Sequence, residues 1–529
     1  GVTVIRARAV LPNGALGPVK DACYIVGLDN ELPVLSLTAD PDDLWGDERG
    51  IYTHPESRGR AWERPVDVVY LEPADAGGTR QIGFPVPAGL RIHGGTTRVN
   101  AEKKSLRLYF RDDYGHNRLD YPLFEDAGRA QPPGHRDSPP SFKRLVVHSG
   151  GQDASARNWT LMRIHLMNNL AQPTNSYTTV SRPVLLYLDG QCEGIFHLRT
   201  YVDDWLLADQ FGIEAADFLD APFAPTHAGV PLVALDPIPP LSELTIEEQA
   251  GVIWERILRF MQTEDLAQPD NYAYVQSQID VDNFMDYHIL QIYAANNDWL
   301  HHNVKQFRPR TQGGRWSWIL WDVDWSFGKA WQSSYEFNMI DWLYSCEREN
   351  FDRGSLPLRE LLENPDFRAS FVSRTADLLN TVLHPKHVVS EIDRLADGLR
   401  ADMHFEVERW PHSGSWEDHV DYLREFAERR PDALRQNMVD GFGLGGTHAL
   451  VVNPPTAEKG SAAVNGTVVT GTWRGVYFEG TTVDVTAVPK PGFRFAGWEP
   501  DSVPQKPRLT LTINQSRAVT PRFLPADRE

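Results

Sequence analysis

Residues 2–30 alternate apolar and polar side chains on both sides of an Asn13-Gly14 pair. An Asn-Gly pair between two alternating segments is a strong sign of a β-hairpin, because both residues tolerate the positive φ angles of a tight turn. We therefore predict two paired strands here, as the closing strands of an N-terminal β module at residues 1–30.

Short apolar runs bounded by Gly, Pro or Asp continue from residue 32 to residue 190. Runs of this length with turn residues at both ends are typical of strands. The pattern predicts strands within residues 32–37, 66–72, 82–95, 105–111, 144–150 and 181–190.

Helical periodicity follows over residues 159–170 and 281–296, and the chain after residue 328 is mainly helical up to about residue 439. Residues 213–247 are rich in Ala and Pro, so we expect an irregular surface insertion there. Residues 441–446 (GFGLGG) have the composition of a linker, and strand and turn signals alternate beyond them. The whole pattern predicts an α+β fold with small flanking all-β modules.

Size and charge narrow the classes of function. With 529 residues the chain should hold more than one domain, since single cores rarely grow beyond about 250–300 residues. There are 72 acids and 52 bases, and the resulting net charge of -20 repels nucleic acid and anionic membranes. Three widely spaced cysteines argue against a disulfide framework or a cysteine-rich zinc site. No apolar run is long enough to cross a bilayer, so we expect no membrane span.

Two acidic clusters carry the candidate chemistry. Asp298 is followed five residues later by Asn303, and the next cluster contains Asp322 and Asp324 before a Phe-Gly turn. The catalytic loop of protein kinases spaces a base and a metal-binding Asn as D-x4-N, and a metal-binding Asp follows. This order predicts phosphoryl transfer.

Asp322 and Asp324 lie two residues apart on a predicted strand, so we expect both side chains on the same face. Two carboxylates held together repel each other unless a cation separates them, and Mg²⁺ prefers oxygen ligands. A solvated acidic face is the alternative, but the surrounding Trp-rich run (316–325) is expected to be buried. We therefore predict a metal site at Asp322 and Asp324, to which Asn303 adds its amide oxygen.

Lys104 and Arg98 are the candidates for binding nucleotide phosphates, because the charge on a transferred phosphoryl group must be neutralised. Both follow Gly94-Gly95, where small residues let backbone N–H groups approach a phosphate. A Gly-Gly pair is also common in an ordinary hairpin, so the turn alone does not decide the matter.

Residues 31–440 resemble the spore coat protein H (CotH) kinase family, an atypical branch of the protein-kinase-like fold. The stretches that carry the resemblance, in chain order, are Gly89–Arg98, Lys104–Leu108, Tyr187–Gly190, Gly194–Leu198, Asn297-Asp298, His302-Asn303 and Trp321–Gly328. The resemblance implies an atypical kinase domain that uses ATP and Mg²⁺ or Mn²⁺. It also implies that Asp298 is the catalytic carboxylate and that Asp322 is a direct metal ligand.

Two positions depart from the family pattern. Thr200 stands where a Glu usually pairs with the nucleotide lysine, and Glu193 and Asp203 are the candidates to replace it. His148 lies where an Arg is common. His301 and His302 are adjacent without a partner four residues on, which favours structural hydrogen bonding over zinc binding.

Residues 450–525, beyond a linker at 441–449, resemble a bacterial internalin B-repeat-like β module through Gly480–Ala487, Gly492–Trp498 and Val519–Phe523. Such modules decorate exported proteins. The resemblance thus implies a secreted or cell-surface bacterial protein whose substrate is another surface or extracellular protein.

The leading prediction is an exported kinase that transfers the ATP γ-phosphoryl group to a protein hydroxyl. A kinase-fold enzyme with a different transfer, such as nucleotidylation or glutamylation, and a catalytically inactive surface scaffold are the alternatives, because a fold alone does not decide the chemistry. A glycosidase is a poor fit, because its two carboxylates must flank a bond from opposite sides.

Overall fold

The computed structural model describes residues 2–7, 12, 20–25, 27, 29–75, 78–124, 141–155, 158–221, 226–227, 230–231, 241–329, 334–348, 350–454 and 458–526. The predicted N-terminal strands are present as β1 (Val2–Ala7) and β2 (Lys20–Ile25), which pair antiparallel. The predicted Asn13-Gly14 turn between them lies outside the described residues.

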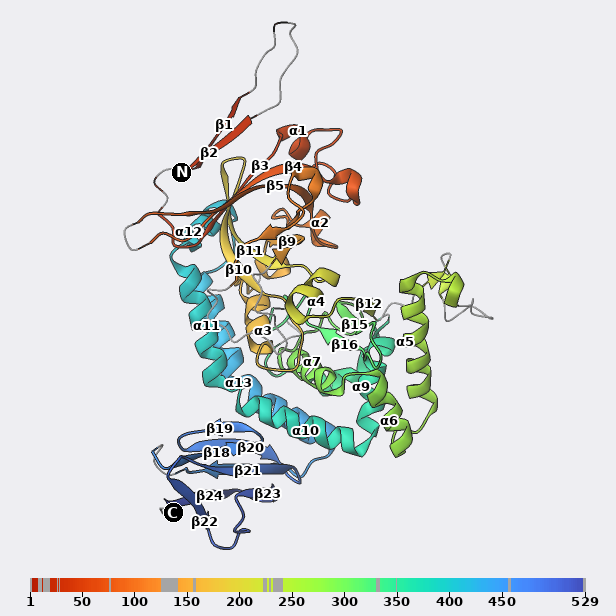
Figure 1. The fold of residues 1–529 in the computed structure, drawn as a ribbon, viewed down its shortest axis with the longest axis vertical. Helices are drawn as coiled ribbons and strands as arrows, with labels where there is room; N and C mark the ends of the chain where they lie inside the picture. Colours follow the sequence, from red (N-terminus) through yellow and green to blue (C-terminus); the bar gives the residue numbers. More distant parts are fainter. Residues whose placement is uncertain are drawn as a thin grey trace.

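The strands predicted between residues 32 and 190 form most of a closed barrel, drawn in red to yellow in the upper half of Figure 1. The order is β10-β11-β9-β6-β5-β4-β3, and a parallel pairing of β10 with β3 closes it, with Leu185 opposite Val34. Every second residue of β4 is buried, as expected for strands with one face toward a core. The bounds are β3 (Val34–Thr38), β4 (Arg64–Leu71), β5 (Ile82–Ile92), β6 (Leu106–Tyr109), β9 (Arg144–His148), β10 (Ser181–Leu188) and β11 (Gln191–Thr200).

The middle of the molecule is helical (Figure 1). Helix α7 (Val281–Tyr293) has apolar residues on all sides and lies in the centre, with every residue from Asn283 to Tyr293 buried. Helix α5 (Ile246–Thr263) begins at a capping box formed by Thr245 and Glu248. The other α-helices of the described residues are α1 (Pro41–Trp45), α2 (Thr97–Asn100), α3 (Arg163–Ala171), α4 (Asp204–Phe211), α6 (Pro269–Gln278), α8 (Met339–Ser345), α9 (Phe351–Glu363), α10 (Pro365–Asn380), α11 (Pro385–Arg400), α12 (Met403–Arg409) and α13 (Trp416–Phe442).

A small sheet, β12-β15-β16, lies beside α7 and corrects two expectations. The predicted irregular insertion at 213–247 contributes β12 (Ala216–Ala221), which pairs with β15 (Val304–Pro309). Strand β16 (Ser317–Ile319) ends before the acidic pair, so Asp322 and Asp324 are not on a strand. Asp322 instead has a left-handed backbone with φ 52°, and strand alternation does not explain why the two carboxylates meet.

The C-terminal module is a pair of four-stranded sheets, in blue in Figure 1, with orders β20-β17-β24-β22 and β19-β18-β21-β23. Strand β20 packs on helix α10, and the apolar core of the module is continuous with the helical core. The predicted linker is short, because α13 ends at Phe442 and β17 begins at Thr447. The strands are β17 (Thr447–Val452), β18 (Gly460–Val464), β19 (Thr467–Val469), β20 (Trp473–Phe478), β21 (Thr482–Pro489), β22 (Phe493–Glu499), β23 (Arg508–Thr512) and β24 (Arg517–Pro525).

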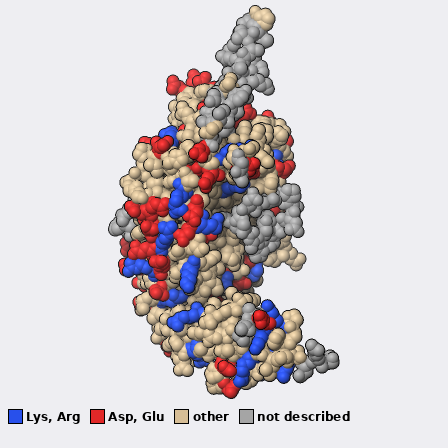
Figure 2. Space-filling model, turned by 90° about the vertical axis from the view of Figure 1, so that its left-hand side faces the viewer, with Lys and Arg blue, Asp and Glu red and all other residues tan. Residues whose placement is uncertain are grey.

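Acidic and basic side chains mix closely on the face of α11–α13, which Figure 2 shows. Arg400 pairs there with Glu417 at 2.8 Å, and Arg424 pairs with Asp393 at 2.7 Å. Exposed pairs of this kind add little stability. Among the described residues, no helix has the length and apolar character needed to span a membrane.

Candidate active site

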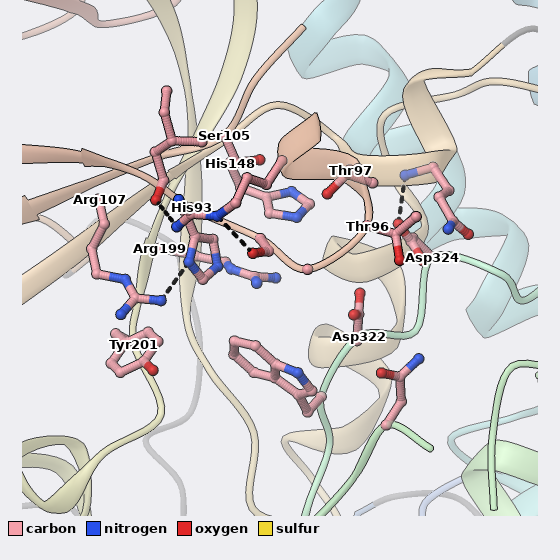
Figure 3. Close-up of a pocket in the computed structure, with 18 of the residues that line it drawn as sticks. His93, Thr96, Thr97, Ser105, Arg107, His148, Arg199, Tyr201, Asp322 and Asp324 are labelled. Carbon is pink, nitrogen blue, oxygen red and sulfur yellow. Dashed lines mark hydrogen bonds between the residues drawn. The ribbon is translucent and has the colours of Figure 1, made fainter. Parts of the chain in front are cut away.

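A cavity of about 610 Å³ lies where the barrel meets the helical part. The four acidic-cluster residues predicted from the sequence all line it, from two separate loops: Asp298 and Asn303, and Asp322 and Asp324. The barrel contributes the opposite wall. In Figure 3, Asp322 and Asp324 lie on one side, and His93, Arg107 and Arg199 lie on the other.

Asp298 is held in place by two neighbours on its own loop. The side-chain amide of Asn303 donates to Oδ2 of Asp298 at 2.9 Å and to its backbone carbonyl at 3.1 Å. Nε2 of His302 lies 2.5 Å from Oδ1. Because the Asn303 nitrogen is engaged by Asp298, the amide oxygen of Asn303 remains available for a ligand.

Non-glycine residues with positive φ concentrate around these two loops: Ala295 (48°), Leu300 (65°), Asn303 (58°), Asp322 (52°) and Phe327 (50°). Left-handed Ala, Leu and Phe are uncommon, and such conformations persist only where the surrounding structure enforces them. The buried Arg163 supplies part of that enforcement, since its guanidinium donates to the carbonyls of Ser326 at 2.8 Å and Phe327 at 3.3 Å.

Asp322 and Asp324 share a buried environment. Burial raises the pKa of Asp322, and Asp298 adds to the effect against the opposing influence of Arg199. The pKa of Asp324 is raised further, by burial and then by the charge of Asp322. The backbone N–H of Gln152 donates to Oδ2 of Asp324 at 2.7 Å. The two carboxylates therefore repel each other, which is the electrostatic situation that a bound cation relieves.

Arg199, on β11, is a buried cation in the cavity wall. Burial lowers its pKa to about 10, although Asp322 and Asp324 oppose the shift. Its Nε has no hydrogen-bond partner among the described residues. A buried guanidinium with an unused donor beside a cavity is suited to an anionic ligand.

Arg107, on β6, lies near Arg199 in Figure 3. Its guanidinium stacks 3.8 Å from the ring centroid of Tyr201 and donates to Nδ1 of His93 at 2.5 Å. His93 and His148 both line the cavity, and burial followed by the charges of nearby arginines lowers their pKa values well below the ordinary range. Both imidazoles are thus neutral at pH 7. Since Nδ1 of His93 accepts a hydrogen bond, its Nε2 carries the proton.

Lys104 does not line this cavity, contrary to its predicted role. Its ammonium donates to the carbonyls of Arg98 and Ala101, both at 2.9 Å, and it borders a different pocket with Trp45 and Trp410. Arg98 lies at the cavity wall, but its guanidinium donates to the carbonyls of Gly94, Pro55, Ser57 and Ile92. Lys104 is therefore held away from any phosphate in the cavity, and Arg98 braces the Gly94-Gly95 turn.

Thr200, which stands in place of the usual glutamate, and the two candidates to replace it, Glu193 and Asp203, all have other partners. Thr200 accepts a hydrogen bond from the Val180 N–H, Glu193 pairs with Arg409 at 3.0 Å, and Asp203 caps α4. Among the described residues, Lys103 instead forms a buried pair with Glu406 of α12, at 2.7 Å. Neither residue lines the cavity, so this pair fastens α12 to the barrel.

The comparisons with known proteins agree with the predicted family. A family model described as CotH kinase protein matches residues 90–434, more than half of the chain. The chain belongs to the CotH kinase family. A second model, described as a divergent InlB B-repeat domain, matches residues 459–527 of this CotH-family chain. No curated protein matches the chain.

The residues predicted from the two acidic clusters all line this cavity, whereas most of the basic residues that line it were not predicted from the sequence. The missed residues that line the cavity include His93, Arg107, His148 and Arg199. Arg199 lies next to Thr200 in the stretch that departs from the family pattern, which is the one signal that pointed to it. Of the Trp cluster, Trp316 and Trp318 are core residues as expected, whereas Trp321 and Trp325 line the cavity.

Proposed function

We propose that this chain is an exported, metal-dependent kinase that transfers the γ-phosphoryl group of ATP to a hydroxyl group of another protein. One observation carries the proposal: a single cavity brings together Asp298, Asn303, Asp322 and Asp324 across from Arg107 and Arg199. Carboxylates and an amide for metal ions, a separate carboxylate for the acceptor, and cations for phosphate are the parts that phosphoryl transfer requires.

The donor set fits Mg²⁺ or Mn²⁺. Asp322, Asp324 and the amide oxygen of Asn303 are hard oxygen donors. Burial raises the pKa values of both carboxylates, and the charge of Asp322 raises the pKa of Asp324 further, so a cation between them is favoured. When bound, the metal would neutralise charge on the nucleotide phosphates.

Of the remaining residues, some would bind the nucleotide and others the acceptor. Arg199 and Arg107 would donate to phosphate oxygens in place of the predicted Lys104, and the Nε2–H of His93 could add a neutral donor. Asp298, held by Asn303 and His302, would orient the acceptor hydroxyl and accept its proton.

The net charge and the C-terminal module bear on the acceptor and on the location of the protein. The net charge of -20 argues against nucleic acid as a partner, so a protein acceptor is favoured. The InlB B-repeat-like module is compatible with a cell-surface protein, and on that basis we place the substrate among surface or extracellular proteins.

Thermal unfolding with and without ATP and Mg²⁺ or Mn²⁺ tests the nucleotide site. A ligand at 100 times its Kd stabilises the native state by about 2.7 kcal/mol, which shifts the midpoint measurably. We expect a shift that requires metal and disappears in Asp322→Ala. Asp352→Ala is the matched control, because that carboxylate is exposed on α9, and it should retain the shift.

The mass of the modified acceptor then separates the chemistries. An added phosphate supports the proposal, whereas an added nucleotide or glutamate would replace it with the alternative transfers. If no nucleotide shifts the midpoint in the presence of either metal, the kinase proposal fails and a surface scaffold becomes the better description.

A further inference from the structure

Asp298, His301 and His302 gather on the loop after α7 into a group with the composition of a metal site. Each contributes one ligand atom, and these atoms all lie within 4.8 Å of one another. Nε2 of His301 is 3.7 Å from Oδ1 of Asp298, and Nε2 of His302 is 2.5 Å from the same oxygen. The spacing of His301 and His302 alone favoured structural hydrogen bonding, but the fold brings Asp298 to both as a third ligand. This group includes neither Asp322 nor Asp324.

The surroundings of His301 point independently to a ligand. Nδ1 of His301 lies 2.8 Å from the carbonyl of Trp299, which can only accept, so the proton is on Nδ1 and the lone pair is on Nε2. Histidines that bind metals usually donate their other ring N–H to a carbonyl or carboxylate in this way. Asp298 is supported similarly, because Asn303 donates to its second oxygen, Oδ2.

The donor set selects a different class of ion from the carboxylate pair. Two imidazoles with one carboxylate suit Zn²⁺ and related transition metals, whereas Mg²⁺ prefers oxygen donors. We propose that Asp298, His301 and His302 form a second metal site, which binds Zn²⁺ or a similar transition-metal ion and takes Asp298 away from the acceptor hydroxyl. The prediction that Zn²⁺ inhibits the enzyme rests on the proposed function. The prediction that Zn²⁺ binds to these three residues does not.

Two existing contacts must give way when the ion binds. Nε2 of His302 must give up the proton that faces Oδ1 of Asp298, to its own Nδ1 in a neutral imidazole or to solvent from an imidazolium, and the ion takes the place of that proton. Nη1 of Arg348, which donates to Nε2 of His301 at 3.1 Å, must leave that atom. Arg348 keeps its contact with the carbonyl of Asn297 at 2.6 Å, so it has an alternative position close by. Arg348 is therefore a built-in competitor of the ion.

Direct Zn²⁺ titration of the full chain by calorimetry, in excess Mg²⁺ and without nucleotide, tests the site. We expect one Zn²⁺ per chain at this site, and a Kd about 10- to 100-fold weaker in His302→Ala. His404→Ala is the matched control, because His404 is an exposed histidine on α12, and it should bind as the wild type does. Arg348→Gln should bind Zn²⁺ several-fold more tightly, because it removes the competing cation.

Visible absorption of bound Co²⁺ gives a second measurement, since its intensity separates an ion held in a four-coordinate site from a six-coordinate, largely hydrated one. Equal Zn²⁺ affinity in the wild type and His302→Ala, or no binding by a folded wild type, would overturn the proposal. The Arg348→Gln variant keeps all three ligands, so a gain of affinity in it tests the competition by Arg348 separately from the loss of a ligand. Failure of the kinase proposal would appear separately, as the absence of an ATP-dependent thermal shift.

Discussion

The side-chain nitrogen of Asn303 lies 2.9 Å from Oδ2 of Asp298 and thereby couples the proposed base to the proposed metal site. One amide group contacts both the base and the metal site, because its nitrogen orients Asp298 while its oxygen remains available to bind the metal. Asn303 has φ 58°, a conformation that Asn and Asp tolerate better than other non-glycine residues.

Asn303→Asp should therefore keep the backbone conformation and remove the hydrogen bond that couples this position to Asp298. Two carboxylates would face each other across the former hydrogen bond, and we expect transfer activity to fall about 10- to 100-fold. Steady-state phosphorylation of a generic protein acceptor measures the effect. Asn350→Asp is the matched control, since Asn350 has φ 63° and no side-chain cap interaction, and it should leave the rate unchanged.

We expect substitutions of Arg199 and of Lys104 to have different effects on the affinity for nucleotide. Arg199→Met removes a buried cation from the cavity wall, and a hydrogen bond to a charged group contributes about 1.5–3 kcal/mol. The Kd for ATP with metal should weaken about 10- to 100-fold. Lys104→Met should leave it within about twofold, because Lys104 donates to carbonyls outside the cavity. Calorimetric titration of both variants decides between the two cations, and a loss confined to Lys104→Met would restore the sequence prediction.

The part of the site that could be predicted is the part built within single loops. Asp298 and Asn303 are five residues apart after one buried helix, and Asp322 and Asp324 follow one short strand, so local spacing carries the information. Arg107 and Arg199 reach the cavity only because β6, β9 and β11 are neighbours in the barrel. Single-sequence patterns do not give the order of strands in a sheet.

The different roles of the adjacent residues Lys103 and Lys104 could not be predicted from the sequence either. They are adjacent, but Lys103 is buried against Glu406, 303 residues away in sequence, whereas Lys104 faces a separate pocket. Residues 102 and 103 form a bend ahead of β6, so the alternation of a strand does not describe these two side chains. Nothing local in the sequence distinguishes the two lysines.

The Lys103–Glu406 pair should be among the most costly polar contacts to break. Glu406 also accepts from the backbone N–H of Ile195 at 2.8 Å, and Gly194 leaves no room for a Cβ beside it. Glu406→Gln leaves a buried ammonium without its anionic partner, so we expect a loss of about 3–5 kcal/mol in the free energy of unfolding. Urea denaturation measures it.

The control is the exposed Arg400–Glu417 pair. Glu417→Gln should change the free energy of unfolding by less than about 1 kcal/mol, because exposed ion pairs contribute little. Similar losses in both variants would contradict the assignment of Lys103–Glu406 as a buried structural pair.

The same pair predicts how stability depends on pH. Burial alone would raise the pKa of Glu406, but Lys103 and the hydrogen bonds to the carboxylate outweigh it and lower the pKa below 4.5. The stability that Glu406 contributes is therefore complete above pH 4.5 and is lost as the pH falls through its folded-state pKa. The gap in unfolding free energy between the wild type and Glu406→Gln should narrow on acidification. A gap that stays constant down to about pH 3 would show that ionisation of Glu406 is not its source.

The C-terminal module should be docked rather than loosely tethered, and Asn380 at the end of α10 is the residue that tests this. Its Nδ2 donates to the carbonyl of Val476 at 3.0 Å, and its Oδ1 accepts from the N–H of Val476 at 2.9 Å. Asn380→Ala leaves both backbone groups of β20 without partners, at a cost of about 1–3 kcal/mol.

We expect Asn380→Ala to expose the connection at residues 443–446, so that limited proteolysis cuts there faster than in the wild type. Asn271→Ala is the control, because the side chain of Asn271 makes one exposed contact with the carbonyl of Asp265, and cleavage should not change. Transfer activity should be unaffected in both variants, since neither residue lines the cavity. Equal cleavage rates in the wild type and Asn380→Ala would mean that the apolar contact between α10 and β20 holds the module without the two hydrogen bonds of Asn380.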